Sequence, residues 1–534
     1  MADIDYREYE KMSPFEIKDG LMKLAKRSAQ KSTNALLNAG RGNPNWIATT
    51  PREGFFLFGQ FALTESRRTM DNPAAGLGGM PQMKGIAARF DAWLAKHAED
   101  PGADFLSRMV EHGVKMFGFD ADAFVFELTD SIIGDNYPVP DRMLVHAEQV
   151  AHRYLMWAMG ANAPIGKFDL YAVEGGTAAM CYIFKSLIAN RILKKGDTIA
   201  MGTPIFTPYI EIAELEDYAF KAVHVRATQE HRFQYSDEEI RKLEDPKIKA
   251  FFVVNPGNPT SMAIDPQTMK KLVDLVNTKR PDLILLTDDV YGTFVPNFRS
   301  LMCELPYNTI CVYSYSKYFG CTGWRLGVIG INEKNILDDL LTKLPAKELE
   351  ALDNRYRSIT LEPRKLKMID RIVADSRDVA LNHTAGLSLP QQVMMTMFSI
   401  SELMDTDKVY QKACMAICTD RVNMLLEGLP LDLQPNANFA GYYGTIDFEF
   451  WLRKYVGEEM VTWLKANVHP LDLVYRLAED HSIVLLNGGG FDAPNWSVRV
   501  SFANLPDDVY DDIGRGVRAV GRGYVDTFNA LKGK

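Results

Sequence analysis

The sequence has 534 residues, of which 47% are hydrophobic and 24% are charged, and its formal net charge is −9. At roughly 150 residues per domain, the chain suggests two to four domains with a large buried core. The acidic balance argues against a nucleic acid or an anionic membrane as partner, because both bind to a concentrated basic surface.

The cysteines and the first residues bear on compartment. The six cysteines are sparse and stand mostly among apolar residues, which is typical of a reducing compartment. Cys414 and Cys418 have helical spacing, but no second Cys or His pair nearby completes a metal site. The start of the chain lacks the basic and apolar regions of a signal peptide, and no apolar run approaches the roughly 18 residues of a membrane helix. The sequence therefore predicts a soluble cytoplasmic protein without a bound metal.

The first part of the chain predicts helices. Residues 1–35 are charged and look helical, so we expect an arm there, and residues 36–46 (LLNAGRGNPNW) form a turn-rich loop. Residues 51–130 have mixed apolar periodicity, with helical stretches such as 85–99.

From about residue 140 onward, short apolar runs alternate with helical or charged segments. The runs end in glycine, proline or polar residues, as in YAVEGG, FFVVNPGNPT, LILLTDDVYG and TICVYSYSK. Such runs are typical of strands in a parallel sheet that is buried on both faces. Their polar ends mark the carboxyl edge of the sheet, where open α/β sheets bind ligands. The charged helices of residues 331–375 predict a solvated or intersubunit face, and the end of the chain predicts a smaller α/β domain.

The first two strand ends offer a glycine turn and an aromatic ring. Gly175, Gly176 and Thr177 stand where a predicted strand meets a helix, so their N–H groups could bind a phosphate. An ordinary turn between strand and helix can have the same residues, and the spacing fits neither a P-loop nor a dinucleotide-binding fingerprint. Phe206, at the end of the next strand, is either a core residue or a ring that stacks on a planar ligand.

The next strand ends offer amides and acids. Asn255 and Asn258 lie in a loop broken by two prolines, and they either form an ordinary turn or present an amide to a ligand. Asp288 and Asp289 end an apolar strand, where a buried acid needs a cation or a proton-bearing partner. Either acid could instead cap a helix.

The most informative stretch is SYSKYFGCTGWRLG, residues 314–327. Lys317 stands at the end of a predicted strand. A lysine at such a position within a pocket can lose its hydration and become a nucleophile. Ser314 and Arg325 can both bind a phosphate, the arginine through its bidentate fork. A lone lysine is usually a surface residue, but the whole set occurs in one order on successive strand ends. One ligand needs all of it: pyridoxal 5′-phosphate (PLP), which has an aldehyde for the lysine, a pyridine nitrogen for the acid and a phosphate.

These motifs resemble those of the aminotransferase-like, fold-type I enzymes that depend on PLP, and the resemblance runs from about residue 36 to 510. It implies an α/β fold whose large domain has a mostly parallel, two-sided buried sheet, with a smaller α/β domain and a helical N-terminal arm. The domains expected are an arm and substrate-side loop, a helical insertion or part of the small domain, a PLP-binding domain and a C-terminal small domain, at residues 1–50, 51–135, 136–375 and 376–534.

The resemblance also implies roles for single residues. Lys317 would bond to the cofactor aldehyde and later carry the Cα proton, and Asp288 would keep the pyridine nitrogen protonated. Tyr291 and Asn258 would contact the ring oxygen, and Phe206 would stack on the ring face. Gly175, Gly176, Thr177, Ser314 and Arg325 would bind the phosphate, which Tyr137 would also reach across a dimer interface. Arg499, with Asn258 beside it, would bind the substrate α-carboxylate.

Within this family, the long acidic chain and the segments GRGNPNW, LTDSIIGDNYPVPDRML and LNHTAGLSLPQQ resemble the aspartate 4-decarboxylases. Those lyases convert L-aspartate to L-alanine and CO2, with side transamination that uses a keto acid such as pyruvate or 2-oxoglutarate. Arg41 is the candidate for the β-carboxylate, with ordinary surface charge as the alternative. Two departures from the family pattern are Ser261, where a glycine is usual, and extra length before residue 136 and in 331–375.

Two other functions stay open at this point. The chain could be an aspartate or other aminotransferase, which shares the first half of the reaction. It could also be a PLP-binding regulator without catalysis, although residues 1–130 contain no basic DNA-binding stretch. The resemblance implies a homo-oligomer, at least a dimer, and allows a dodecamer.

Overall fold

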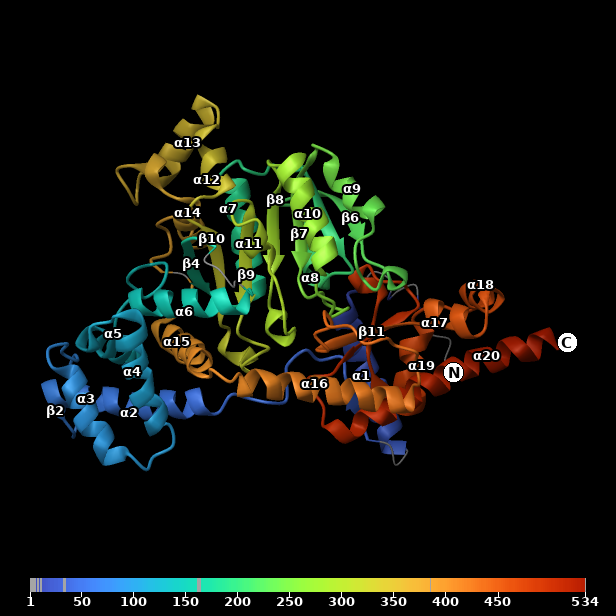
Figure 1. Ribbon diagram of the computed structural model, residues 1–534, viewed down its shortest axis with the longest axis horizontal. Coiled ribbons are helices and arrows are strands. Elements are labelled where there is room, and N and C mark those ends of the chain that lie inside the picture. Colours follow the sequence, from blue (N-terminus) through green and yellow to red (C-terminus); the bar gives the residue numbers. More distant parts are fainter. Residues whose placement is uncertain are drawn as a thin grey trace.

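The computed structural model describes residues 6, 9, 12–31, 35–160, 165–384 and 386–533. A seven-stranded sheet forms the centre of the protein, with a group of helices from the first part of the chain on one side and the C-terminal elements on the other (Figure 1). Helices α15 (Leu389–Met404) and α16 (Val409–Gly428) run below the sheet from one side to the other. Among the described residues, no helix has the length and apolar character needed to cross a membrane.

The central sheet has the strand order β4-β10-β9-β8-β7-β5-β6. All pairs are parallel except that β10 runs antiparallel to both β4 and β9. Every residue of β4, β8, β9 and β10 is buried, as the apolar runs in the sequence predict for a sheet covered on both faces. The α/β fold with a mostly parallel sheet is thus confirmed. The strands are β4 (Phe168–Val173), β5 (Thr198–Thr203), β6 (Lys221–Arg226), β7 (Ile248–Val254), β8 (Ile284–Asp288), β9 (Thr309–Ser314) and β10 (Gly327–Asn332).

The register of these strands gathers their ends at one edge. Val254 of β7 is paired with Asp288 of β8, and Asp288 with Val312 of β9. Gly327 of β10 stands between Ser314 of β9 and Val173 of β4. The polar segments that follow these positions therefore leave the sheet side by side.

Helices cover both faces of this sheet (Figure 1). Asp265, whose side chain accepts a hydrogen bond from the Thr268 backbone N–H, caps α10, so the chain turns into a helix directly after the proline-broken loop. The helices are α6 (Val145–Ala158), α7 (Gly176–Ala189), α8 (Thr207–Glu214), α9 (Asp237–Arg241), α10 (Pro266–Thr278), α11 (Leu301–Glu304), α12 (Ile336–Thr342), α13 (Ala346–Tyr356) and α14 (Met368–Ser376).

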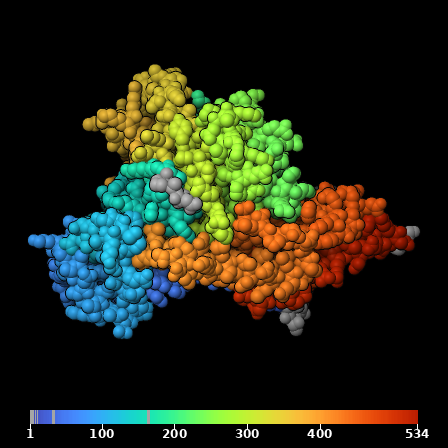
Figure 2. All heavy atoms as spheres, viewed as in Figure 1, coloured from blue at the N-terminus to red at the C-terminus, as the bar shows by residue number. Residues whose placement is uncertain are grey.

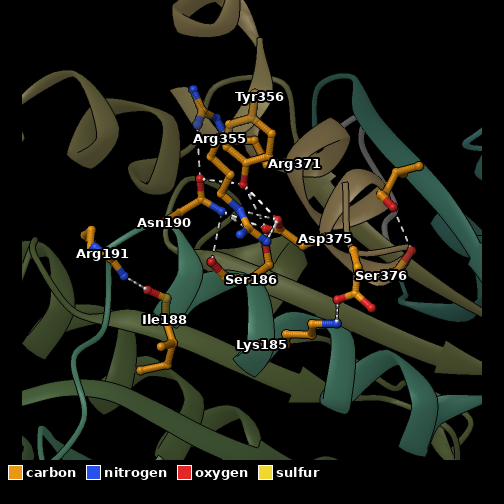
Figure 3. Close-up of polar contacts among 12 residues, drawn as sticks. Lys185, Ser186, Ile188, Asn190, Arg191, Arg355, Tyr356, Arg371, Asp375 and Ser376 are labelled. Atoms are coloured by element: carbon orange, nitrogen blue, oxygen red, sulfur yellow. Dashed lines mark hydrogen bonds and ion pairs between the residues drawn. The ribbon is translucent and has the colours of Figure 1, made fainter. Parts of the chain in front are cut away.

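The segment 331–375 is only partly a solvated face. Helices α12 and α13 project at the upper left of Figures 1 and 2, but α14 returns to the body of the protein. There Asp375 is fully buried and accepts hydrogen bonds from Ser186 Oγ at 2.5 Å and from Tyr356 OH at 2.9 Å, and it pairs with Arg355 at 2.7 Å (Figure 3). This cluster ties α13 and α14 to α7, whose first residue lies at the ligand edge of the sheet.

The helical group of the first part of the chain has an aromatic core. Phe58 and Phe61 of α2 pack against Phe90 of α3, and Phe124 of α5 is fully buried nearby. Helix α15 packs against this group and against α6, so it joins the group to the central sheet. The elements are α2 (Thr50–Thr69), a short hairpin of β2 (Asp71–Asn72) and β3 (Leu77–Gly78), α3 (Ile86–Leu94), α4 (Ala103–Phe117) and α5 (Ala121–Ile133).

The C-terminal elements form a second core around a three-stranded antiparallel sheet of order β11-β14-β13. Helix α1 packs on α19, and β1 pairs in parallel with β12, so the N-terminal segment completes this region. The four domain boundaries expected from the sequence stay a prediction. The elements are α1 (Pro14–Lys31), β1 (Leu37–Asn38), β11 (Tyr443–Asp447), α17 (Phe448–Tyr455), α18 (Glu458–Asn467), α19 (Asp472–His481), β12 (Ile483–Val484), β13 (Leu486–Asn487), β14 (Ser497–Ser501) and α20 (Tyr510–Lys532).

Candidate active site

A cavity of about 230 Å³ lies between the carboxyl edge of the central sheet and the C-terminal sheet. It brings together residues from opposite ends of the chain, because the loop after β1 and strands β11 and β14 cover the carboxyl ends of the central strands. The predicted residues that line it are Gly176, Thr177, Phe206, Asn258, Asp288, Tyr291, Ser314, Lys317, Arg325 and Arg499.

Lys317 lies three residues after the end of β9, and its side chain reaches into the cavity. Its Nζ donates a hydrogen bond to the backbone oxygen of Gly42 at 2.9 Å, so the turn-rich loop 36–46 does lie beside the lysine. A Cβ at position 42 would stand 2.5 Å from the Tyr443 hydroxyl and 3.3 Å from Nζ, which leaves room only for glycine. The phenol of Tyr442 donates to the same Gly42 oxygen at 2.8 Å.

The two adjacent acids have different surroundings. Asp288 faces the cavity and accepts hydrogen bonds from Tyr209 OH at 2.6 Å and from the Val290 N–H at 3.2 Å. Asp289 instead accepts from Thr287 Oγ1 at 2.5 Å and lies 3.5 Å from Cys311 Sγ in the core. Burial raises the pKa of Asp288 to about 6 and that of Asp289 to about 7. Asp288 is therefore the acid that faces the cavity. Its hydrogen-bond donors are neutral, so a cationic ring nitrogen would supply the charged partner that it lacks.

The glycine turn and Arg325 form an anion cradle at the start of α7. Gly175 has φ of +93°, and a Cβ there would come within 2.5 Å of Arg325 Nη2, so the guanidinium lies directly over the turn. Arg325 donates to the backbone oxygens of Thr322 at 3.0 Å and Glu174 at 3.1 Å, and it is exposed at the cavity mouth. Ser314 also lines the cavity, and its hydroxyl lies 3.0 Å from Ser316 Oγ. Free N–H groups at a helix start, a hydroxyl and a guanidinium match a phosphate.

Arg499 of β14 is 1% exposed, and its three nitrogen atoms differ. Nη1 donates to Asn258 Oδ1 at 3.0 Å and Nη2 donates to the Gly40 oxygen at 2.8 Å, but Nε has no hydrogen-bond partner. Its guanidinium stacks on the Tyr443 ring at 4.2 Å. Within the described part of the chain, no carboxylate pairs with it. A buried guanidinium in this state gains free energy when a carboxylate binds, because its charge is otherwise uncompensated.

Three predicted residues need separate mention. Phe206 is half-buried, lines the cavity and meets the rings of Tyr209 and Phe15 edge-on, with centroids 5.3 and 5.7 Å apart. Tyr137 is 66% exposed and lies edge-on to His383, outside the cavity. Arg41 is exposed and does not line the cavity either. The roles expected for these side chains stay predictions.

Sequence reasoning missed several cavity residues. Tyr209 follows Phe206 by three positions and so shares its face of the helix start, which is a signal that the sequence does contain. Tyr443 carries no such signal, because its proximity to Lys317 arises only from the packing of the C-terminal sheet on the strand ends. Ser261 acquires a role as well, since its hydroxyl accepts the backbone N–H of Tyr443 at 2.7 Å.

Comparisons with known proteins identify the family of the chain. Residues 174–376 match the family model of class I and II aminotransferases. The chain is 45% identical, over 99% of its length and 99% of the relative's, to a bifunctional aspartate aminotransferase and L-aspartate β-decarboxylase of Pseudomonas sp..

Solved structures share the fold. A double mutant of Thermus thermophilus aspartate aminotransferase aligns with a TM-score of 0.56 at 17% identity, over 98% of this chain and 100% of that one. An aromatic aminotransferase from Pyrococcus horikoshii aligns with a TM-score of 0.57 at 15% identity, over 93% and 99% of the two chains. The chain therefore belongs to the PLP-dependent family of class I and II aminotransferases that includes the bifunctional Pseudomonas enzyme.

Proposed function

We propose that the protein decarboxylates L-aspartate at its β-carbon to give L-alanine and CO2, and that it transaminates aspartate to a lesser extent with a keto acid as acceptor. One observation carries this proposal. Lys317 shares a cavity with a buried acid, Asp288, and with Arg499, a buried arginine that pairs with no carboxylate among the described residues. The likeness to a bifunctional enzyme along the whole chain supports the choice of aspartate.

The residues of the cavity fit PLP. Asp288 would hold its ring nitrogen, the cradle of Gly175, Gly176, Thr177, Ser314 and Arg325 would hold its phosphate, and Lys317 would bind its aldehyde. When bound, the cofactor withdraws electrons from the bonds at the substrate α-carbon. The raised pKa of Asp288 shows the cost of burying its charge, and a protonated ring nitrogen beside it would offset that cost.

The protein's own side chains then set the course of the reaction. Arg499 binds the α-carboxylate through its fork and so orients the α-carbon toward Lys317. Lys317 takes the proton from the α-carbon and later returns it there. Decarboxylation is favoured when the leaving β-carboxylate is held less tightly than the charge that develops in the transition state. Arg41, the candidate for the β-carboxylate, is exposed and would hold that group less tightly than a second buried arginine would.

The products of aspartate distinguish the two candidate activities. With purified protein and aspartate as the sole amino acid, we expect alanine and CO2 in equal amounts without any added keto acid. Formation of oxaloacetate that depends strictly on 2-oxoglutarate, with no alanine, would instead establish an aminotransferase. A keto acid should also sustain the decarboxylase by recovering cofactor that side transamination has converted.

We also propose that the enzyme is cytoplasmic and at least dimeric, with Tyr137 contributing to the site of a second protomer, and that a dodecamer is one assembly open to it. All six cysteines are free thiols, which agrees with a reducing compartment. Tyr137 is exposed in the protomer, as a side chain that serves a neighbour must be. Sedimentation of the wild type and of Tyr137→Phe tests the assembly, and weaker cofactor binding by an unchanged oligomer would support the shared site.

A further inference from the structure

Tyr443, the first residue of β11, lies beside Lys317 and Arg499, two of the cations that line the cavity. Its hydroxyl and Lys317 Nζ lie 2.5 and 3.3 Å from the same point beside Gly42, and its ring lies 4.2 Å from the Arg499 guanidinium. Tyr291 donates a hydrogen bond to this hydroxyl at 3.2 Å. Because the Tyr443 hydroxyl accepts this hydrogen bond, it can donate its own proton to a group inside the cavity.

Ser261 holds Tyr443 in this position. Its hydroxyl accepts the Tyr443 backbone N–H at 2.7 Å, and its carbonyl accepts the N–H of Ala440 at 2.8 Å. Ser261 has φ of +54° and is fully buried. A side chain in this left-handed conformation costs about 1–2 kcal/mol relative to glycine, so the hydroxyl must compensate for a local penalty. The hydrogen bond joins the Asn258 loop to the strand that carries Tyr443.

The charges around Tyr443 suit a proton donor. Burial favours its neutral form, but the positive charges of Lys317 and Arg499 outweigh burial and hold the pKa of Tyr443 below its ordinary value. The neighbouring phenols behave differently, since burial raises the pKa of Tyr291 and of Tyr442 well above the ordinary value. Among these three phenols, Tyr443 gives up its proton most readily.

The reaction requires a second proton donor besides Lys317. When the bond between the β-carbon and its carboxylate breaks, CO2 leaves, and the electron pair that it leaves behind must form a new C–H bond at that carbon. Lys317 carries the proton that it removed from the α-carbon and needs it there to complete alanine. One further proton is therefore consumed for each aspartate, and it comes ultimately from solvent.

On the basis of the proposed decarboxylation, we infer that Tyr443 donates this proton to the substrate β-carbon and that Ser261 is the residue that positions it. Tyr443 lies beside Lys317 and next to Arg499, the proposed partner of the α-carboxylate. Its phenolate regains a proton from solvent as the product leaves, so atoms and charge balance over the cycle. The phenol ring also fills the space beside Lys317, where water would otherwise favour release of a keto acid.

The primary test compares two reactions of the holoenzyme in the wild type and Tyr443→Phe, which keeps the ring on Arg499. Removal of a general acid costs about 10²–10⁴ in rate, so alanine formation should fall at least about 100-fold. Transamination of aspartate with 2-oxoglutarate should fall less than about tenfold, because it needs no proton on the β-carbon. An unchanged ratio of alanine to oxaloacetate would overturn the inference. A wild type that forms no alanine would instead refute the proposed function.

Ser261→Gly tests the positioning role without endangering the fold, because glycine adopts positive φ without strain. Ser482→Gly is a matched control, since Ser482 is equally buried, has φ of +58° and lies outside the cavity. In Ser261→Gly alone, the amide hydrogen of Tyr443 should exchange faster, with or without substrate, and the ratio of alanine to oxaloacetate should fall several-fold. Exchange and product ratio equal to those of Ser482→Gly would refute the role of Ser261.

Discussion

Two buried groups of charged residues in this protein are built alike but completed differently. In the cluster of Figure 3, Arg371 uses all three nitrogen atoms, on the oxygens of Leu366, Asn190 and Pro363, at 2.8 to 3.0 Å. Asp375, in the same cluster, has an arginine partner and three further donors, namely Ser186, Asn190 and Tyr356. Within the cavity, by contrast, Arg499 leaves Nε unmatched, and Asp288 has only neutral donors.

The difference separates a structural cluster from a binding site. Buried polar groups that satisfy one another inside the chain stabilise it and leave nothing for a ligand. Groups that are buried but incomplete cost free energy in the absence of a ligand, and a molecule with complementary charges recovers that cost. In the proposed function, PLP would supply a cation for Asp288, and an amino acid would supply a carboxylate for Arg499.

The largest expected effect is on the cavity side of this comparison, at its nucleophile. Lys317→Ala should abolish turnover and the visible absorbance of the bound cofactor, because no other amine lines the described cavity. Its thermal unfolding temperature should stay within a few degrees of the wild type, since Nζ makes one hydrogen bond to Gly42. Normal turnover by this variant would refute the assignment.

The paired acids give the next contrast. Asp288→Asn should lower turnover about 10³-fold or more while leaving the apoprotein at least as stable, because it removes a buried charge from neutral donors. Asp375→Asn should keep the site but lower the free energy of unfolding by about 3 kcal/mol, because Arg355 loses its partner. Denaturant unfolding and steady-state rates measure both effects, and equal losses of activity in the two variants would remove the distinction.

The paired arginines should separate binding from stability. Arg499→Ala should weaken binding of aspartate about 100-fold or more, with little change in cofactor affinity, because its guanidinium, with Nε unmatched in the protein, is the proposed partner of the substrate carboxylate. Arg371→Ala should leave aspartate binding unchanged in the folded protein and destabilise it by about 2–3 kcal/mol. Titration with aspartate and with the cofactor checks the first variant, and equal loss of both ligands would contradict its role.

The smallest expected effect is the pH dependence of stability in the apoprotein. The pKa of Asp288 is raised by burial from 3.8 to about 6, so the folded state binds its proton more tightly than the unfolded state does. Protonated Asp288 therefore adds to the free energy of unfolding at low pH. This stabilisation, at most about 3 kcal/mol, is lost as the pH rises from about 4 to about 6. Asp288→Asn should flatten the stability profile in this window. If the stability profile of Asp288→Asn is identical to that of the wild type, burial does not raise the pKa of Asp288.

The sequence predicted the sheet side of the site better than the other side. Gly175, Asp288, Ser314 and Lys317 were predictable together because the carboxyl ends of parallel strands converge. The strand pattern alone left Asp288 and Asp289 equivalent, because adjacent side chains of an extended segment face opposite sides and only the register decides which one meets the cavity, and the choice of Asp288 rested on the family resemblance. Tyr443 was out of reach, since its bond to Ser261 spans 182 positions of the chain.

The fold followed the same division. Apolar runs that ended in glycine or polar residues were sufficient to predict a parallel sheet buried on both faces. The cluster around Asp375 was not visible, because its members come from α7, α13 and α14 and each looks like an ordinary charged or polar helix residue. The sequence therefore predicted a solvated or intersubunit face where part of the segment 331–375 is anchored in the core.

The most direct measurement of the central claim is the mass balance of aspartate consumed by the purified holoenzyme in the absence of any keto acid. If Lys317, Asp288 and Arg499 form a decarboxylase site, each aspartate lost should appear as one alanine and one CO2. Aspartate that remains unconsumed until 2-oxoglutarate is added, and then yields only oxaloacetate and glutamate, would contradict it.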